Sequence, residues 1–285
     1  MPVTMTDFDP YFETQYNNRA AVPDHADFIQ SWIDRSASFR GRAANAHLKI
    51  AYGDTDRAVM DIFPCSSPDR QLKSPVHIFI HGGYWQAMSK DSFSFIAEHF
   101  NAAGECAVIL NYDLCPQVSL SQISQQIFQA ALWILEHIDQ YGGDPERVQV
   151  SGHSAGGHLL ASLLTRDWSA YGFSQPPFCQ MNALSGLFDL RPLLNTSTNV
   201  GLRLDQQTAL DNSPLHSQLQ HSSNELKLRL FVGELESDEY KKQSQELLNH
   251  WQRHFNVSYQ LLSQAHHFSI LDAFLQQEYP PIQSI

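Results

Sequence analysis

The chain has 285 residues, of which 42% are hydrophobic and 17% charged, and its formal net charge is −12. This length permits one large α/β domain or two small ones, with enough apolar residues for a substantial core. Nucleic acids and anionic lipid surfaces are bound by basic faces, so the acidic balance argues against both as partners. No apolar run approaches the roughly 18 residues that cross a bilayer, so we expect no membrane span.

The start of the chain and its cysteines both indicate a cytoplasmic protein. Residues 1–10 lack the basic start and the apolar run of a secretory signal. The four cysteines, Cys65, Cys106, Cys115 and Cys179, are scattered without a C-x-x-C pair. This spacing favours reduced thiols over a zinc site or a disulfide framework. The sequence also carries no dinucleotide fingerprint or phosphate loop, so no cofactor is expected.

Short apolar runs rich in β-branched residues alternate with helical patterns from about residue 46 onward. This alternation predicts an α/β fold, with a mostly parallel sheet of eight strands and helices on both faces. The first two strands should pair antiparallel at the edge of the sheet, because only a short Gly-Asp turn separates them. The expected strands are Leu48–Tyr52, Val59–Phe63, Val76–His81, Ala107–Asn111, Val148–Ser151, Gln180–Ala183, Leu228–Val232 and Ser258–Leu262. The expected helices are Lys90–Ala103, Leu120–Tyr141, Ala155–Thr165, Asp238–His254 and Ser269–Leu275.

Two segments do not follow this alternation. Residues 1–45 carry aromatic side chains at loosely helical spacing, and we expect an N-terminal helical arm packed over the sheet. Residues 186–225 form a polar insertion beyond the end of a strand, where insertions commonly build a cap over a pocket. No internal repeat or long linker is seen, so we expect one domain over residues 1–285 with a small cap.

A serine between two glycines is the first candidate for chemistry. The stretch Gly152-His153-Ser154-Ala155-Gly156 follows a buried strand and precedes an apolar helix. Small residues on both sides of Ser154 permit the sharp strand-to-helix turn that exposes a nucleophilic hydroxyl above a sheet. The alternative is a glycine-rich turn with an incidental serine, since the motif alone is common by chance. The strand–turn–helix context favours a nucleophile, which needs a neighbouring base to lose its proton.

A second candidate is the sequence His-Gly-Gly-Tyr-Trp at 81–85, directly after an apolar strand. Two glycines at a strand end let backbone amides turn toward a reacting carbonyl and form an oxyanion hole. By position, the expected donors are the amides of Gly83, Tyr84 and Ala155. The alternative is an ordinary Gly-Gly turn followed by core aromatics.

An acid and a base follow Ser154 in the chain order that a serine nucleophile at such a turn requires. The loop after the strand at 228–232 holds Glu234, Glu236, Asp238 and Glu239. One carboxylate there would orient an imidazole and stabilise its charged form. Asp238 and Glu239 also suit the first turn of the following helix. The residues alone leave the acid open among Glu234, Glu236 and Asp238.

The base is expected in the pair His266-His267, after the last strand. We favour His267, because Phe268 and the apolar pair at 270–271 would hold it in packed structure. His250 and His254 lie four apart on a predicted helix, a spacing that can bind metal. No Glu-bearing zinc motif accompanies them, so we expect a surface pair and no metal site.

The remaining residues around the two glycine motifs are expected to be structural. His81 should brace its loop by hydrogen bonds, and Trp85 should be buried beside it. His153 and His158 flank Ser154 and should be packing or hydrogen-bonding neighbours, not a second catalytic set.

Together these motifs resemble the kynurenine formamidase branch of the α/β-hydrolases, a group that also contains many bacterial carboxylesterases. The resemblance extends from about Tyr11 to Phe274 and implies the α/β-hydrolase fold. The motifs that carry it are His-Gly-Gly-Tyr-Trp at 81–85, Asn-Tyr-Asp-Leu-Cys-Pro at 111–116, Gly-His-Ser-Ala-Gly-Gly-His at 152–158, Leu-Ser-Gly-Leu-Phe-Asp-Leu at 184–190 and His-Phe at 267–268. The first and third of these five motifs are the most specific.

The resemblance implies Ser154 as nucleophile, His267 as base and Glu236 as acid. Formamidases of animals usually carry Asp in a similar loop that ends in Gln-Ser, here at 243–244. The Glu is therefore a departure that weakens the transfer of a formamide substrate, although Glu serves in some α/β-hydrolases. The segment Tyr-Asn-Asn-Arg at 16–19 also resembles the bacterial relatives, and we take its role in shaping the pocket mouth as a hypothesis.

We therefore expect a serine hydrolase that cleaves small carboxylic esters through an acyl-enzyme. The pocket should be compact and partly apolar, suited to small aryl or short-chain acyl groups. One alternative is an arylformamidase acting on amides of the N-formylkynurenine type. An alternative of another class is a non-catalytic ligand receptor with the same fold. The oligomeric state is left open, with a homodimer as the candidate assembly.

Overall fold

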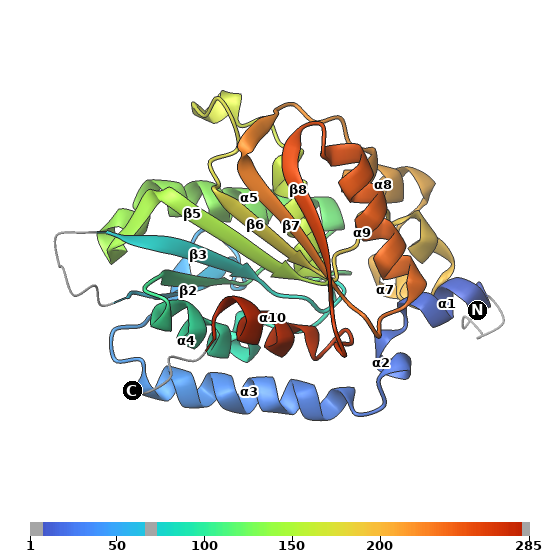
Figure 1. The fold of residues 1–285 in the computed structure, drawn as a ribbon, viewed down its shortest axis with the longest axis horizontal. Helices are drawn as coiled ribbons and strands as arrows, with labels where there is room; N and C mark the ends of the chain where they lie inside the picture. The colour runs from blue at the N-terminus through green and yellow to red at the C-terminus, as the bar shows by residue number, and fades with distance from the viewer. Residues whose placement is uncertain (1–7, 66–72, 281–285) are drawn as a thin grey trace.

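The computed structural model describes residues 8–65 and 73–280. Its eight strands form one sheet in the order β1-β2-β4-β3-β5-β6-β7-β8 (Figure 1). β2 pairs antiparallel with β1 and β4, and every other neighbouring pair is parallel. This confirms the predicted α/β class and the antiparallel edge. The strands are β1 His47–Ala51, β2 Val59–Phe63, β3 Ser74–Ile80, β4 Cys106–Leu110, β5 Gly143–His153, β6 Gln180–Leu184, β7 Ser223–Gly233 and β8 Phe255–Leu262.

β3 illustrates why the central strands are continuous apolar runs. Val76, Ile78 and Ile80 pack in one core cluster, whereas Phe79 packs in the other. Successive side chains of a strand point to opposite faces, and helices cover both faces here. Both sets of side chains are therefore buried, and the sheet forms a rigid base for residues at its carboxyl edge.

Helices α5, α6 and α9 contribute to the first cluster, and α4 and α10 to the second. Their bounds are α4 Ser94–Ala102, α5 Leu120–His137, α6 Ala155–Leu164, α9 Asp238–Trp251 and α10 Ile270–Glu278. The helix predicted from Lys90 instead begins with a short 3₁₀ turn, η2 Lys90–Ser92. The Lys90 ammonium is buried on Asp61 at 2.8 Å, and its backbone N–H donates to Asn111. These contacts tie the turn to β2 and to the end of β4.

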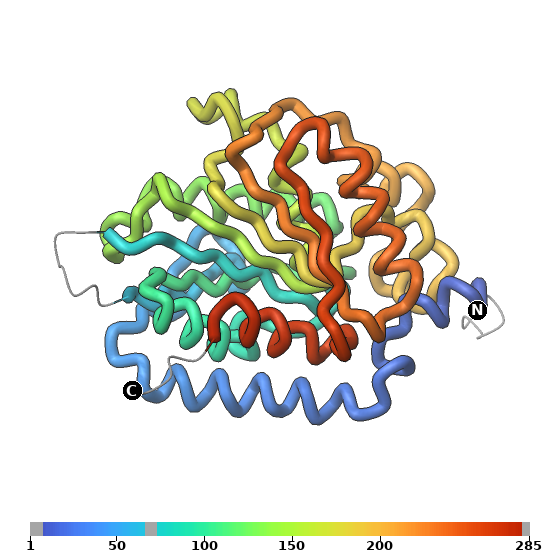
Figure 2. Tube along the Cα trace, viewed as in Figure 1, coloured from blue at the N-terminus to red at the C-terminus, as the bar shows by residue number. Residues whose placement is uncertain are grey.

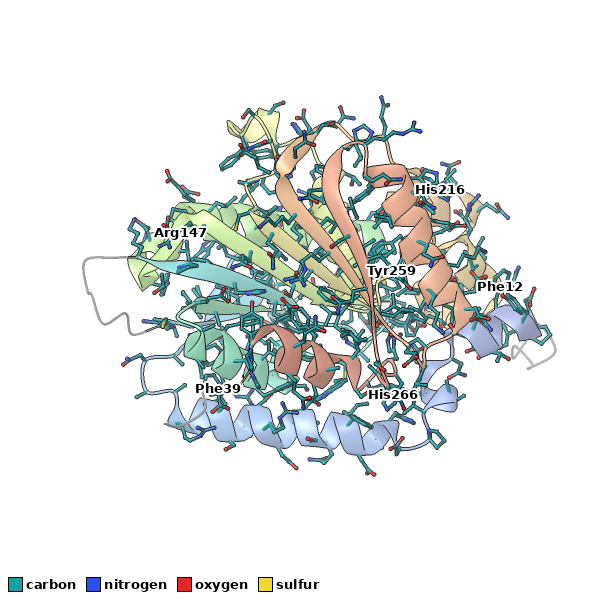
Figure 3. The ribbon with its side chains drawn as sticks, viewed as in Figure 1. Phe12, Phe39, Arg147, His216, Tyr259 and His266 are labelled. Carbon is teal, nitrogen blue, oxygen red and sulfur yellow. The ribbon has the colours of Figure 1, made fainter. Side chains whose placement is uncertain are left out.

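The N-terminal arm is helical as predicted, but it packs mostly on helices. It comprises α1 Pro10–Tyr16, α2 Asn18–Ala21 and α3 His25–Arg42. α3 runs outside α4 and α10 (Figures 1 and 2), and Arg35 pairs with Asp272 of α10 at 2.8 Å. Phe39 (Figure 3) reaches the sheet, with its ring 5.2 Å from that of Phe63. The expectation of an arm over the sheet is corrected because α4 and α10 already cover this face.

The insertion after β6 is built of short turns and helices. They are η5 Arg191–Asn195, α7 Asn199–Leu202, α8 Gln206–Asp211 and η6 Pro214–His216. The Ser213 hydroxyl connects the beginning of the insertion to α8 by accepting from Leu190 N and donating to Ala209 O. β7 begins at Ser223, so the insertion is slightly shorter than the predicted 186–225.

None of the helices within the described ranges is long and apolar enough to cross a bilayer. All four cysteines are free thiols, as expected from their spacing. Burial raises the pKa of Cys106 to about 12 and that of Cys115 to about 11, so both remain protonated near neutral pH.

Candidate active site

Ser154 occupies a sharp turn between β5 and α6. Its backbone has φ 56° and ψ −119°, a conformation that residues other than glycine rarely adopt. The turn is held from below, because Ser154 N donates to Leu184 O at 2.8 Å. Local strain of this kind persists where the surrounding structure fixes the backbone, and it clusters at functional sites. The arrangement is the nucleophile elbow that the sequence pattern indicates.

The glycines around Ser154 are required by close backbone contacts. A Cβ added to Gly152 would lie 2.2 Å from Gly156 O, and one added to Gly156 would lie 2.0 Å from Ile80 O. A Cβ added to Gly82 would lie 3.0 Å from the Cβ of Ser154. The start of α6, the end of β3 and the following glycine loop are therefore in direct contact at this point.

Ser154, His267 and Glu236 form a continuous hydrogen-bond chain, which we call the Ser–His–Glu relay. His267 Nε2 lies 3.0 Å from Ser154 Oγ, and His267 Nδ1 lies 2.7 Å from Glu236 Oε2. The three side chains are buried, with exposed fractions of 2%, 6% and 7% in that order. With the carboxylate accepting from Nδ1–H, the Nε2 lone pair faces the serine hydroxyl. This is the tautomer that a general base needs.

Both carboxylate oxygens of Glu236 are satisfied. Oε2 accepts from His267, and Oε1 accepts from Ser185 Oγ at 2.6 Å and from Gly233 N at 2.7 Å. A carboxylate that accepts several hydrogen bonds is held in one orientation. Glu236 can therefore hold the imidazole although its side chain is one methylene longer than that of Asp.

The other two candidate acids lie elsewhere. Glu234 is exposed and accepts from Gln264 N and Ser263 Oγ, and these hydrogen bonds lower its pKa. Asp238 is the first residue of α9, where a carboxylate favours the helix N-terminus. Neither forms a hydrogen bond with His267 among the described residues, whereas Glu236 does. Of the three acids that the sequence leaves open, Glu236 is the one that contacts the imidazole of His267.

The preference for His267 over His266 agrees with the geometry. His266 Nδ1 accepts from the backbone N–H groups of Phe268 and Ser269 at 3.2 Å. Its ring makes an edge-to-face contact with that of Phe28 of α3, with the ring centroids 4.9 Å apart. His266 therefore braces the loop that carries its neighbour.

The glycine loop after β3 has an unusual backbone. Gly83, Tyr84 and Trp85 have φ values of 114°, 50° and 55°. Within residues 8–65 and 73–280, the amides of Gly83, Tyr84 and Ala155 donate to no other backbone group. The amide of Gly82 is free in the same way, and Gly82 lies beside Ser154. It joins the three predicted donors as a candidate.

The structural expectations for the surrounding side chains are confirmed. His81 is buried, with Nδ1 2.7 Å from Gly82 O and Nε2 3.3 Å from Asn111 Oδ1. Trp85 is fully buried. His153 contacts the carbonyl of His267 through Nε2 at 2.8 Å, and burial holds its pKa well below the usual range.

A cavity of about 310 Å³ opens on Ser154. One part of its wall is apolar, and the other is polar. The apolar part is lined by Ile29, Trp32, Met88, Phe93 and Phe268. The polar part is lined by Tyr16, Asn17, Asn18, Arg19, Gln86, Ser197 and Thr198.

The predicted cap contributes two residues to this wall, Ser197 and Thr198, and the N-terminal arm contributes six. The arm is therefore the larger part of the cover, which the sequence pattern did not indicate. The segment at 16–19 was the available signal, because it lines the cavity as the hypothesis about the pocket mouth requires.

Tyr240 is a further site residue that the sequence did not single out. Its ring centroid lies 4.9 Å from that of His267, and its hydroxyl lies 2.9 Å from the Tyr84 hydroxyl. Asn18 Nδ2 donates to the Tyr240 hydroxyl at 2.8 Å. Burial raises the pKa of both phenols, so both stay neutral. Tyr240 thus joins the arm to the imidazole.

A second serine, histidine and glutamate are joined in the same pattern inside the core. His77 Nε2 lies 2.7 Å from Ser151 Oγ, and His77 Nδ1 lies 2.9 Å from Glu105 Oε2. Ser151 and His77 are fully buried, and the His77 ring is stacked on Phe100 at 3.7 Å. This triplet is not at a strained turn and not part of the cavity wall at Ser154. A hydrogen-bond pattern alone therefore does not identify an active site.

Comparison with known proteins agrees with this fold. A family profile described as alpha/beta hydrolase fold matches residues 77–228. The chain belongs to the α/β-hydrolase fold family. It is 29% identical over 278 residues to kynurenine formamidase of Danio rerio, covering 94% of this chain and 90% of that one. It is 26% identical to kynurenine formamidase of Drosophila melanogaster, covering 92% and 87%.

Among solved structures, a protein of Silicibacter sp. provisionally named thioesterase superposes with a TM-score of 0.80. The two are 29% identical, over 95% of this chain and 96% of that one. These relatives have the names of hydrolytic enzymes, and this α/β-hydrolase is a hydrolase of the formamidase-like and esterase branch.

The contact between Gly156 and Ile80 generates a prediction about stability. Gly156→Ala should lower the free energy of unfolding by about 1–3 kcal/mol or more, because the added methyl meets backbone that cannot move aside as a side chain would. Urea unfolding followed by circular dichroism measures this.

Gly41→Ala is the matched control, since a Cβ there has nothing within 4 Å. It should stabilise α3 by up to about 1 kcal/mol. Equal stability of Gly156→Ala and the unchanged chain would contradict the steric argument.

Proposed function

We propose that this hydrolase cleaves small carboxylic esters through an acyl-enzyme, with Ser154, His267 and Glu236 as its catalytic residues. The observation that carries the proposal is the unbroken relay from Glu236 to Ser154, which opens on a cavity beside free backbone amides. A serine hydroxyl needs a positioned base and a place for the oxyanion, and both lie next to Ser154.

The proposed reaction has two halves. Ser154 Oγ attacks the carbonyl carbon while His267 Nε2 takes its proton, and the ionised Glu236 stabilises the imidazolium. The amides of Gly83, Tyr84 and Ala155 are proposed to stabilise the oxyanion. His267 then gives the proton to the leaving group. Water, deprotonated by the same imidazole, releases the acid and regenerates the serine.

The size and lining of the cavity favour small substrates. Its volume of about 310 Å³ lies at the lower end of the range of about 300–1,000 Å³ that is usual for ligand pockets. Trp32, Phe93 and Phe268 on its wall suit an aryl ring or a short acyl chain. A long acyl chain would have to extend out of the pocket.

An aryl formamide is the second candidate substrate. The similarity to kynurenine formamidase of Danio rerio favours it, because the match covers 94% of the present chain. Formyl is the smallest acyl group and fits the same reaction. The Glu at position 236 is no obstacle, because its carboxylate reaches His267 Nδ1 at 2.7 Å.

We retain the cytoplasm as the proposed location, which the four free thiols support. The non-catalytic receptor is the alternative of another class, and the enzyme names of the relatives weigh against it. A fluorophosphonate probe separates the two, because a folded receptor would form no adduct at Ser154.

Replacing the nucleophile should abolish turnover. Ser154→Ala should lower kcat for p-nitrophenyl acetate by at least about 10⁴-fold, because the acyl-enzyme can no longer form. The matched control is Ser151→Ala, which removes the serine of the buried triplet.

The Ser151→Ala control should lose about 1–3 kcal/mol of stability, since it leaves buried polar partners unsatisfied, yet keep its turnover. Circular dichroism verifies folding in both variants. Undiminished hydrolysis by folded Ser154→Ala would refute the proposed mechanism.

The choice of acid is tested by two isosteric changes in one loop. Glu236→Gln should lower kcat by about 10⁴-fold, because the amide cannot hold the imidazole in the required tautomer. Glu234→Gln, two residues away and exposed, should leave kcat unchanged. Steady-state kinetics at neutral pH distinguishes them, and comparable losses in both variants would show that the acid is wrongly assigned.

The two candidate substrates are separated by parallel kinetics on aryl acetates and N-formylkynurenine. We expect hydrolysis of both with one Ser154-dependent activity, since both present a small acyl group on an aryl leaving group. The larger kcat/KM names the better substrate class. Turnover of neither, by a protein that reacts with the fluorophosphonate probe, would exclude both assignments.

A further inference from the structure

The cavity at Ser154 has one side chain with a permanent charge among its lining residues, Arg19. The lining also holds the imidazole of His267, which belongs to the relay, and that of His153, whose pKa is held well below its usual range by burial. The phenols of Tyr16 and Tyr84 are the other titratable groups there, and burial raises the pKa of both. Arg19 is exposed, and within the described ranges it forms no ion pair or side-chain hydrogen bond. The chain has 30 acidic residues against 18 basic ones, so a shortage of carboxylates does not explain an unpaired arginine at this place.

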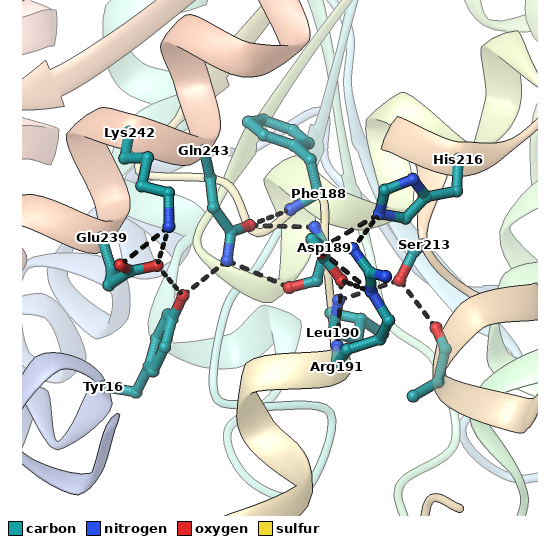
Figure 4. A network of polar contacts seen from close by, with 11 residues as sticks. Tyr16, Phe188, Asp189, Leu190, Arg191, Ser213, His216, Glu239, Lys242 and Gln243 are labelled. Carbon is teal, nitrogen blue, oxygen red and sulfur yellow. Dashed lines mark hydrogen bonds and ion pairs between the residues drawn. The ribbon is translucent and has the colours of Figure 1, made fainter. Parts of the chain in front are cut away.

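The backbone that carries Arg19 is held firmly in position. Tyr84 Oη donates to the carbonyl of Tyr16 at 2.5 Å, and Asn18 Nδ2 donates to the Tyr240 hydroxyl at 2.8 Å. The Tyr16 hydroxyl accepts from Gln243 Nε2 at 2.6 Å (Figure 4). When a ligand binds, a charged side chain on a fixed backbone loses less conformational entropy than one on a free loop.

The anchor extends from the arm to α9. Glu239 accepts from the hydroxyls of Tyr16 and Tyr11, and Lys242 pairs with the same carboxylate at 3.1 Å (Figure 4). Glu239 is therefore fully used in fastening the arm, and its charge is balanced by Lys242. Arg19 is left as the uncompensated charge at the cavity.

The arm lies on the same side of Ser154 as the imidazole. Asn18 and Ala21 of the arm share a second hollow with Glu236 and His267, and the Tyr240 ring connects Asn18 to His267. In acyl transfer the imidazole delivers its proton to the leaving group, so the leaving group must lie on this side. Arg19 directly follows Asn18 and lines the same cavity as His267, which makes it a candidate to contact the leaving group.

We propose that the pocket prefers substrates whose leaving group carries a carboxylate, and that Arg19 binds this carboxylate. The inference rests on the function proposed above and specifies its substrate class. A planar guanidinium binds a carboxylate by donating two parallel hydrogen bonds to its oxygens. The apolar wall at Ile29, Trp32 and Phe268 would hold an aryl ring between the carboxylate and the scissile bond. The favoured class is then an aryl acyl compound with an anionic substituent on the aryl side.

The test uses substrates that differ only in charge. 4-Acetoxybenzoate and 4-acetoxybenzamide share an acyl group and a ring, and the 3-substituted pair places the group at another distance. In Arg19→Gln, the ratio of kcat/KM for acid over amide should fall about fivefold, mainly through KM, as expected for an exposed ion pair. Arg19→Lys should keep part of the ratio, because lysine has the positive charge but lacks the planar guanidinium.

Arg253→Gln is the matched control. Arg253 is also exposed and without an ion pair among the described residues, and it is not part of this cavity wall. The variant makes the same change in net charge and should keep the ratio of the unchanged chain. Added salt, at about 0.5 M, should lower the ratio of the unchanged chain toward that of Arg19→Gln.

An unchanged ratio in Arg19→Gln for both the 3- and the 4-substituted pairs would overturn the inference. Equal losses in Arg19→Gln and Arg253→Gln would also overturn it, because they would indicate overall charge and not a binding contact. Hydrolysis of the neutral amide substrate that depends on Ser154, with no effect of Arg19, would leave the proposed function intact. Ser154-independent hydrolysis would instead refute the proposed function itself.

Discussion

Backbone meets backbone where Gly156 passes the carbonyl of Ile80, and no side chain fits between them. This contact fixes the first turn of α6 against the end of β3. The glycine loop begins immediately after Ile80, so the same contact determines how far its amides lie from Ser154. The strained φ of Ser154 is maintained by this packing and by its hydrogen bond to Leu184. The positions of Ser154 and of the glycine loop are thus two consequences of one steric constraint.

The acid side of the relay depends on hydrogen bonding more than on packing. Ser185 follows β6, and Gly233 ends β7, and both donate to the same oxygen of Glu236. Two neighbouring strands therefore set the position of the carboxylate, and the imidazole takes the remaining oxygen. A longer acid is accommodated because its position is defined by its acceptor atoms, whatever the length of its stem.

Much of this arrangement is predictable from the sequence because it is local. The elbow at Ser154, the glycine loop and the order of acid and base all follow from short motifs placed beside recognisable strands. The choice among Glu234, Glu236 and Asp238 is not local. It depends on the turn after β7 and on Ser185, which is 51 residues from Glu236 along the chain. Chain spacing carries no information about that contact.

The position of the arm escapes prediction for the same reason. Its amphipathic pattern shows that α3 is a helix, but not which surface it covers, and α4 and α10 leave it only the outside of their layer. The contacts of Tyr16 and Asn18 with Tyr240, Glu239 and Gln243 join positions more than 200 residues apart. The buried Ser151–His77–Glu105 triplet adds the opposite lesson, because its residue types would suit catalysis, but it has no strained turn at its serine and no place in the cavity wall.

The arm and the sheet, which are separate parts of the chain, contribute different parts of the site. The residues of the Ser–His–Glu relay lie at the carboxyl ends of the strands and are held by the packing of the sheet. Six residues of the cavity wall, in contrast, come from the first 32 positions. Substitution or exchange of this short segment could alter which molecules are accepted without disturbing the bond-breaking groups. The groups proposed to break the bond and those that select the substrate are therefore physically separate in this hydrolase. Related chains could differ in their substrates while keeping one reaction.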